Sequence, residues 1–296
     1  MPIPVGVDPG AGVGGPGVPG AALHEGSLTL GDVSLGFTDA YGVEWILEGL
    51  SGWSDLPPST GSVEQRAADH GAWYGSAYYG PRILEVRGAI MANSWADAGA
   101  ALDRLWAAVP LSEPDWMYVD EGYQERQTLV RQDGDPIVER LNGWARFSLS
   151  LVAPDPRRYG AEVSASTGLP LTTGGLTLPI TLPVTVGATT TSGLLSVVNE
   201  GNMPTRPVMA VTGPCPPFTI TQVSTGRRLS ALEAVPAGRT MFLDFDRRLA
   251  LLDGTALRVV TGTWFELEPG TNDIQFNSST YDAAAQLTVT FRSAWR

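Results

Sequence analysis

Hydrophobic and polar residues alternate along most of the chain, and a period of two residues predicts β-strands. In the clearest example, Leu84, Val86 and Ile90 fall on one face and Glu85 and Arg87 on the other. The same pattern predicts further strands before residue 160, at 28–37, 41–47, 116–119, 124–130 and 137–152. After residue 193 it predicts strands only, at 195–198, 208–212, 218–223, 239–245, 249–260, 264–267, 274–276 and 287–291.

The period changes to that of a helix in one place. Ser94 is a good N-cap residue, and Asp97 stands three positions further on, close to a capping box. Apolar residues recur at helical spacing from Trp95 to Val109, and Pro110 cannot continue a helix. The sequence therefore predicts one helix in a chain that is otherwise mainly β.

Glycine and proline divide the pattern. Residues 55–62 have the composition of a loop, and 73–81 combine aromatic residues with glycine, which is typical of a surface turn. Asp253-Gly254 lies between two apolar runs and predicts a tight hairpin. Two prolines in residues 153–158 oppose both strand and helix, so we expect a domain boundary there.

Four segments follow from these signals. We expect a Gly/Pro-rich N-terminal segment (1–26), a β-rich domain with the helix (27–158), an inter-domain arm rich in Thr, Gly and Leu (159–192), and a C-terminal two-sheet β-sandwich (193–296).

Composition and charge argue against several classes of function. The 296 residues carry a formal net charge of -12, and every basic residue is Arg, so binding to duplex DNA as the main task is not expected. The single cysteine excludes an intrachain disulfide and a cysteine zinc site. No apolar run has the length of a membrane span and no secretory signal is evident, so we expect synthesis in a cytoplasm and no membrane span.

No motif predicts a cofactor or metal site. Gly10, Gly12 and Gly15 match a dinucleotide fingerprint, but Pro16 and Pro19 forbid the helix that such a site needs. The only two histidines are His24 and His70, and neither a nucleophile elbow nor a zinc-binding helix motif accompanies them.

Paired carboxylates are the strongest enzyme-like feature. Asp244 and Asp246 would share one face of a strand, and Glu266 and Glu268 one face of another, as a glycosidase requires. We favour the simpler interpretation that both pairs lie on solvated strand faces, and we assign no catalytic residue.

The densest aromatic cluster offers a different kind of site. Trp73, Tyr74, Tyr78 and Tyr79, with Arg82 just beyond them, are candidate contacts with a protein partner. Structural anchoring of a loop is an equally good interpretation, and sugar binding is a weaker one.

Two stretches together resemble the distal tail proteins, or minor tail proteins, of siphophages. The first comprises 78–90, the helix, and 147–159, which closes with Ala-Pro-Asp155-Pro156-Arg-Arg-Tyr159. The second comprises 198–207, 211–214, 243–244, 265–276 and the end at 291–295. The resemblance implies an N-terminal ring-forming domain followed by a galectin-like C-terminal sandwich.

The resemblance also implies a function. It predicts a structural protein rather than an enzyme, assembled in the host cytoplasm and located in the virion at the distal end of the tail. A homo-hexameric ring would join the tail tube protein to the tail hub protein, contact tape measure and receptor-binding proteins, and let DNA pass without reading its sequence. We further expect an acidic lumen that does not hold phosphate. The alternative is a host glycan-binding module on the C-terminal sandwich.

Overall fold

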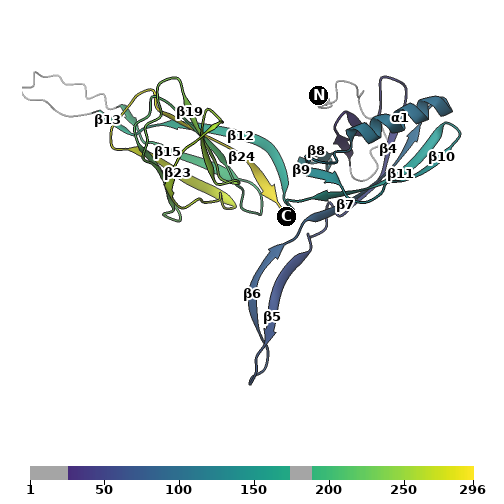
Figure 1. Ribbon diagram of the computed structural model, residues 1–296, viewed down its shortest axis with the longest axis horizontal. Helices are drawn as coiled ribbons and strands as arrows, with labels where there is room; N and C mark the ends of the chain where they lie inside the picture. Colours follow the sequence, from purple (N-terminus) through teal and green to yellow (C-terminus); the bar gives the residue numbers. More distant parts are fainter. Residues whose placement is uncertain (1–25, 174–188) are drawn as a thin grey trace, which may run out of the picture. The chain divides into compact units, whose positions relative to one another are not determined.

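The structure, a computed structural model, describes residues 26–173 and 189–296 (Figure 1). These residues form two compact units, one reaching Gly160 and including Arg296, and the other spanning Ala161–Trp295. The expected segment 1–26 lies, apart from its last residue, outside the described residues. Among the described residues no helix is long and apolar enough to cross a membrane.

The first unit is an antiparallel β-structure with one helix. Strands β10-β11-β7-β4-β3 pair in that order, and β2-β1-β8-β9 form a second run that joins the first where β9 pairs with β11. The strands are β1 (Ser27–Leu30), β2 (Val33–Leu35), β3 (Phe37–Thr38), β4 (Glu44–Ser51), β5 (Ser59–Gln65), β6 (Ala72–Tyr79), β7 (Arg82–Met91), β8 (Asp115–Asp120), β9 (Glu125–Gln132), β10 (Ile137–Leu141) and β11 (Trp144–Ala153).

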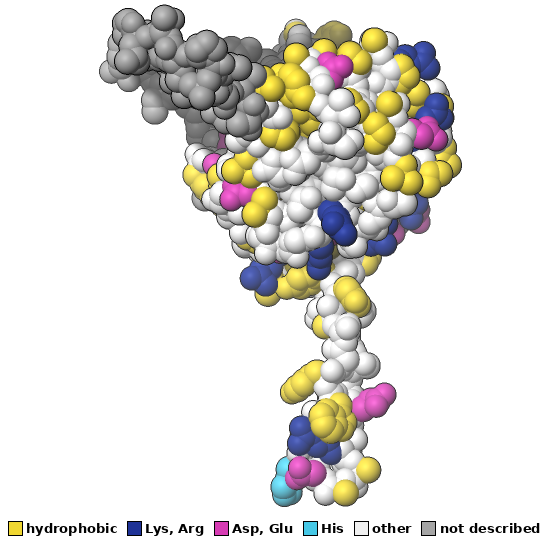
Figure 2. Space-filling view, turned by 90° about the vertical axis from the view of Figure 1, so that its left-hand side faces the viewer, with side chains coloured by type: hydrophobic (Ala, Val, Ile, Leu, Met, Phe, Trp, Pro, Cys, Tyr) yellow, Lys and Arg dark blue, Asp and Glu magenta, His cyan; other side chains and the backbone are white. Residues whose placement is uncertain are grey.

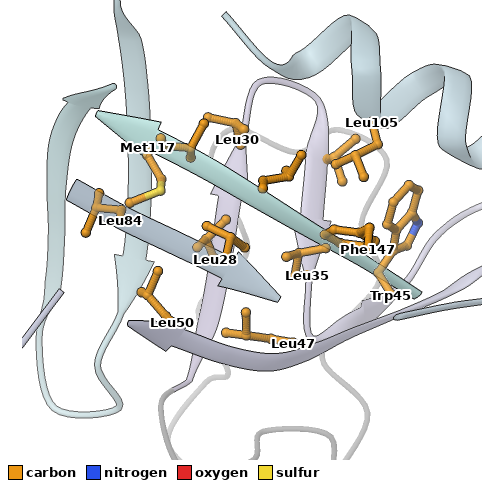
Figure 3. Packing of buried hydrophobic residues seen from close by; sticks show 14 of the residues in the cluster. Leu28, Leu30, Leu35, Trp45, Leu47, Leu50, Leu84, Leu105, Met117 and Phe147 are labelled. Carbon is orange, nitrogen blue, oxygen red and sulfur yellow. The ribbon is translucent and has the colours of Figure 1, made fainter. Parts of the chain in front are cut away.

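Helix α1 (Trp95–Ala108) forms as predicted. The Ser94 hydroxyl accepts a hydrogen bond from the Asp97 backbone N–H at 3.1 Å, which satisfies a donor that the helix itself leaves unpaired. Leu102 and Leu105 lie on the buried face. Figure 3 shows Leu105 pointing into the same apolar cluster as Phe147 of β11.

The core of the first unit follows the predicted alternation. Leu84, Val86 and Ile90 are buried, as are Phe147 and its neighbours two and four residues on. Removing such side chains from water stabilises the fold by roughly 1.5–3 kcal/mol each. These positions therefore fix which face of the β7–β11 ladder points inward.

Asp39 ties the β3–β4 turn to the helix. Its carboxylate accepts hydrogen bonds from the backbone N–H groups of Tyr41 and Val43 and from the indole N–H of Trp45, and it pairs with the Arg104 guanidinium at 2.7 Å. Burial acts to raise the pKa of Asp39, but these four donors outweigh it, so the pKa lies below its ordinary value.

Three local predictions for the first unit were wrong. Residues 137–152 are a hairpin, because Gly143 adopts a positive φ of 74° and reverses the chain between β10 and β11. The expected loop at 55–62 and surface turn at 73–81 instead contribute β5 and β6, which pair with each other. Neither face of that hairpin is buried within the chain, so no apolar–polar period marks it in the sequence.

The second unit is the two-sheet sandwich that was predicted. One sheet has the order β12-β24-β16-β19-β20-β21 and the other β15-β23-β17-β18-β22. Apolar side chains from both sheets fill the space between them. The strands are β12 (Arg158–Gly168), β13 (Leu171–Thr173), β14 (Thr189–Thr191), β15 (Leu194–Asn199), β16 (Val208–Thr212), β17 (Phe218–Gln222), β18 (Arg228–Ala231), β19 (Thr240–Asp244), β20 (Leu249–Leu252), β21 (Ala256–Leu257), β22 (Val260–Gly262), β23 (Gly270–Ser278) and β24 (Gln286–Trp295).

The predicted hairpin at Asp253-Gly254 is confirmed. Both residues have positive φ, 51° and 73°, a conformation that Asp tolerates and Gly adopts freely, and they connect β20 to β21.

The segment expected as an inter-domain arm differs in its first part. From Ala161 to Gly168 it belongs to β12, whose neighbour in the sandwich is β24. Short strands β13 and β14 pair with each other, and residues 174–188 lie outside the described residues. Ser and Thr on β12 carry no hydrophobic alternation, and hydrogen bonds such as Ser164 to Thr290 hold the strand instead.

Candidate interface

The β5–β6 hairpin is the most exposed ordered element of the first unit. Its two strands pair only with each other among the described strands, and almost every side chain on them faces solvent. Figure 1 shows the hairpin projecting from the rest of its unit, and Figure 2 shows hydrophobic side chains along it and a histidine at its end.

Four of the five predicted contact residues lie on β6. Tyr74 and Tyr78 are 85% and 71% exposed, and Val63 stands directly opposite Tyr74 on β5. Trp73, next to Tyr74 on the strand, points to the face opposite to that of Tyr74, and the Arg66 guanidinium stacks over its ring at 4.5 Å. An isolated two-stranded hairpin is marginally stable in water. A hairpin that exposes aromatic side chains on both faces is suited to packing against another chain.

Local bonds order the tip of the hairpin. Arg66 donates its backbone N–H to the Gly71 carbonyl at 3.2 Å, and its guanidinium pairs with Asp69 at 3.5 Å. His70 lies in this turn, and Gly71 has a positive φ of 93°. The turn is therefore closed by its own backbone.

Arg82 anchors the base of the hairpin. Its side chain is 1% exposed, so the expectation that it contacts a partner is wrong for this chain. One terminal nitrogen, Nη1, donates to the carbonyls of Gly52, Trp53 and Asp55, and Nε donates to that of Pro156 at 3.1 Å. Burial, with repulsion from Arg158, lowers the pKa of Arg82 to about 10.

The sequence contained a signal for this burial. Arg82 has the same parity as Leu84 and Val86, so the alternation already placed it on the inner face of β7. Tyr79, the last aromatic of the cluster, is half-buried at the same base, and its hydroxyl lies 3.3 Å from an Arg296 guanidinium nitrogen. The aromatic cluster therefore divides into an exposed part and a structural base.

A buried ion cluster that sequence reasoning missed lies in the same unit. The Glu121 carboxylate pairs with Arg126 at 3.0 Å and Arg158 at 3.1 Å, and it accepts the indole N–H of Trp53 at 2.7 Å. Burial and repulsion from Arg126 lower the pKa of Arg158, and Glu121 opposes that effect. Trp53 and Arg158 are far from Glu121 in sequence, so no local spacing could have predicted that they meet it.

The paired carboxylates of the second unit do not meet as an acid–base pair. Arg206 lies between Asp246 and Glu266, at 2.7 Å and 2.6 Å. Asp244 instead accepts the backbone N–H groups of Asp246 and Arg247, which closes the β19–β20 turn. One guanidinium thus binds a carboxylate from each predicted pair, an arrangement that holds two loops together.

The remaining titratable groups offer little chemistry. Burial raises the pKa of the Cys215 thiol to about 12. Across 26–173 and 189–296, no three His, Cys, Asp or Glu side chains are grouped so that they could hold a metal ion. A small cavity beside Asp39 is lined by Asp32, Phe37, Trp45 and Arg104 and opens to solvent.

Comparison with known proteins relates the C-terminal part of the chain to a family of tail components. Residues 200–295 match the family model described as siphovirus-type tail component, C-terminal domain. The matched residues lie within the second unit, which is therefore similar to the C-terminal domain of siphovirus-type tail components. The fold of the chain is that of the crystal structure of SPP1 Dit (gp 19.1), with a TM-score of 0.64, 12% sequence identity, and coverage of 91% of this chain and 99% of that one. That structure is described as a paradigm of the hub adsorption apparatus in phages that infect Gram-positive bacteria.

A second similar structure belongs to the phage P2 baseplate in its activated conformation with Ca. The TM-score is 0.48 at 10% identity, with coverage of 83% of this chain and 90% of that one, and we base nothing on so distant a likeness. No curated protein sequence matches the chain. The Dit-like fold agrees with the predicted combination of a β-rich domain with one helix and a galectin-like sandwich.

Proposed function

We propose that this protein is a tail component that forms a hexameric ring, which joins the tail tube to the hub and lets DNA pass through its lumen. The observation that carries the proposal is the β5–β6 hairpin, whose Tyr74, Tyr78 and Val63 are left exposed by the described part of the chain. A closed ring gives each copy the same neighbour, so one projecting element per copy can be covered in every copy.

The anchoring at Arg82 also supports the interpretation that the hairpin contacts a neighbouring copy. A rigid base fixes the direction of a projecting element before assembly, and this reduces the entropy that association costs. Charge is consistent with passage of DNA, because a net charge of -12 repels phosphate. We expect an acidic lumen, and a map of the ring with a basic lumen would contradict this part of the proposal.

We also propose that the protein acts as a scaffold and not as an enzyme. Arg206 occupies the one place where carboxylates of both predicted pairs come together, so neither is free to act on a substrate through the other. Asp244→Asn and Glu266→Gln should leave any cell-wall-degrading activity of purified tails unchanged. A loss of such activity in either variant would show that the carboxylates are catalytic.

The glycan-binding alternative receives no specific support. On the outer face of β16, β19 and β20 the exposed side chains include Val208, Phe242 and Leu249, whereas a sugar site needs convergent polar groups beside an aromatic ring. A glycan array probed with the purified chain would decide between the two functions, because a scaffold should bind none of the glycans.

The solution mass of the purified chain tests the ring directly. Six copies of 31.3 kDa, six times that mass, give about 188 kDa, and negative-stain images of that species should show an open ring. The double variant Tyr74→Ser, Tyr78→Ser should remain folded but lose the ring. Tyr281→Ser, an exposed tyrosine in the second unit, is the matched control. A ring that persists in the double variant would remove the hairpin from the interface.

A chain that is monomeric in solution requires the same comparison on assembled particles. There the double variant should fail to enter tails, and the Tyr281→Ser control should enter them normally. Equal incorporation of the two variants would refute the proposed role of the hairpin.

A further inference from the structure

One side of the second unit consists of two edge strands that carry no charge over most of their length. Every residue from Val163 to Asn199 is uncharged. This run contains β12 from its sixth residue onward and all of β15. In the sandwich, β12 is the last strand of one sheet and β15 the last strand of the other. The strands at the opposite ends, β21 and β22, are joined by two residues only, so they share one side and β12 and β15 share the other.

Both edges on this side are open. Beyond Gly160, none of the described strands pairs with the second edge of β12, and none pairs with that of β15. An open edge presents unpaired backbone donors and acceptors, and proteins normally block it with charged residues, proline or a very short strand. Neither β15 nor the part of β12 from Val163 to Gly168 contains a charge or a proline.

The opposite side of the same sandwich is blocked in the usual way. Strand β21 has two residues and β22 has three. Arg258, between them, pairs with Glu233 at 3.2 Å. The β21–β22 side of the sandwich is therefore blocked against strand addition, whereas the β12–β15 side is not.

Side chains on the open side suit an apolar partner. Val163, Leu194 and Val198 are 46%, 42% and 52% exposed. The nearest acidic group on that sheet, Asp273, accepts a hydrogen bond from the Ser196 hydroxyl within the ladder. A charged strand added beside Val163–Gly168 or β15 would lose hydration without meeting an opposite charge on those residues. These edges therefore favour an uncharged segment with apolar residues at alternate positions.

We propose that the β12–β15 side of the sandwich binds such an extended, uncharged segment of a different tail protein as an added strand. A ring of identical copies built through the sandwich alone would need open edges on two of its sides, and the described strands of the sandwich leave only the β12–β15 side open. Two copies could pair symmetrically through this side, but such pairing would produce dimers and not a closed ring. The proposal rests on the proposed function, because that function places the partner in the tail.

Hydrogen exchange on assembled tails tests the added strand. The outward-facing amides of β15 should exchange at least about tenfold more slowly in tails than in the free chain, as expected when a backbone hydrogen bond forms. Amides of β22, on the blocked side, should exchange at the same rate in both samples.

A photo-crosslinking residue identifies the partner segment. Val198→p-benzoylphenylalanine should crosslink, in tails, to an uncharged segment with alternating apolar residues in another tail protein. The matched control is Val259→p-benzoylphenylalanine, which is exposed on the blocked side and should give no such product. Val198→Lys should reduce incorporation of that partner at least about tenfold, and Val259→Lys should not.

The outcomes separate this proposal from the proposed function. Crosslinks to a second copy of the chain, or unchanged β15 exchange in tails that contain the chain, would overturn the added strand and leave the ring untouched. Absence of the chain from purified tails would instead refute the proposed function and this proposal together. Crosslinks from residue 198 to a charged or helical segment would also overturn it.

Discussion

Replacing Arg82 with methionine should destabilise the first unit strongly while leaving the second unit unchanged. Methionine keeps the length of the buried stem but removes every donor. Four backbone carbonyls, those of Gly52, Trp53, Asp55 and Pro156, would then lose their hydrogen bond.

The magnitude follows from two opposing effects. Each buried carbonyl left without a donor costs about 1–3 kcal/mol. Removing the guanidinium also relieves its own desolvation and the repulsion from Arg158, both of which act on it in the folded chain. We therefore expect a net loss of about 3–5 kcal/mol, the range for breaking a buried charged network.

Urea denaturation followed by tryptophan fluorescence measures the effect, because most of the nine tryptophans belong to the first unit. Arg87→Met is the matched control on the same strand, since Arg87 points outward and pairs with Glu85 at 3.1 Å on the surface. It should leave the midpoint nearly unchanged. A loss below about 1 kcal/mol in Arg82→Met would refute the anchoring role, because a loss that small corresponds to a single hydrogen bond.

Three further predictions follow from the geometry. Asp39→Asn should reduce the loss of stability at acidic pH. Because the folded-state pKa of Asp39 is lowered, its carboxylate stabilises the fold above its ordinary pKa, and this stabilisation is lost as pH falls through the folded-state pKa. Between about pH 5 and pH 2 the free energy of unfolding should therefore decrease more for the wild-type chain than for the variant. An equal slope in both proteins would contradict this. Gly88→Ala should destabilise by about 1–3 kcal/mol, because the added Cβ would lie 2.5 Å from Phe147 Cζ and 2.7 Å from the Ile46 carbonyl oxygen. In α1 a Cβ added at Gly99 would meet no atom within 4 Å apart from its chain neighbours and the helix's own backbone, so Gly99→Ala should stabilise by about 0.5–1 kcal/mol. Urea denaturation measures both glycine variants, and a change of the same sign in both would show that packing does not control their stability.

Much of the fold could be predicted because its signals are local. The Ser94 cap, the helical spacing after it and Pro110 define α1 within one stretch of chain. Alternation in β7, β11 and the second unit marks strands that bury one face, and Asp253-Gly254 marks a turn that few other residues allow. In each case one segment contains all the information that its conformation requires.

The structure of the candidate interface could be predicted only in part from local sequence patterns. The aromatic cluster at 73–79 was recognised from the sequence, but its strand was not, because a hairpin exposed on both faces has no buried side to impose a period. Arg82 was named as a candidate partner contact together with the aromatic residues, although its position in the alternation of β7 placed it on the inner face. The charge of Arg82 was a poorer indicator of exposure than its position in the strand, because four backbone carbonyls accept hydrogen bonds from the buried guanidinium.

The sequence by itself determined the mainly β class, the single helix, the sandwich and the family resemblance, because each depends on periodicity or on motifs within short stretches. Only the tertiary structure decided that Glu121 meets Arg158, that Arg206 binds one carboxylate of each predicted pair, and that the uncharged run falls on two edge strands of one side. The physical reason is that hydrogen bonds, ion pairs and open edges join residues distant in sequence. Their partners exist only once the sheets are in register.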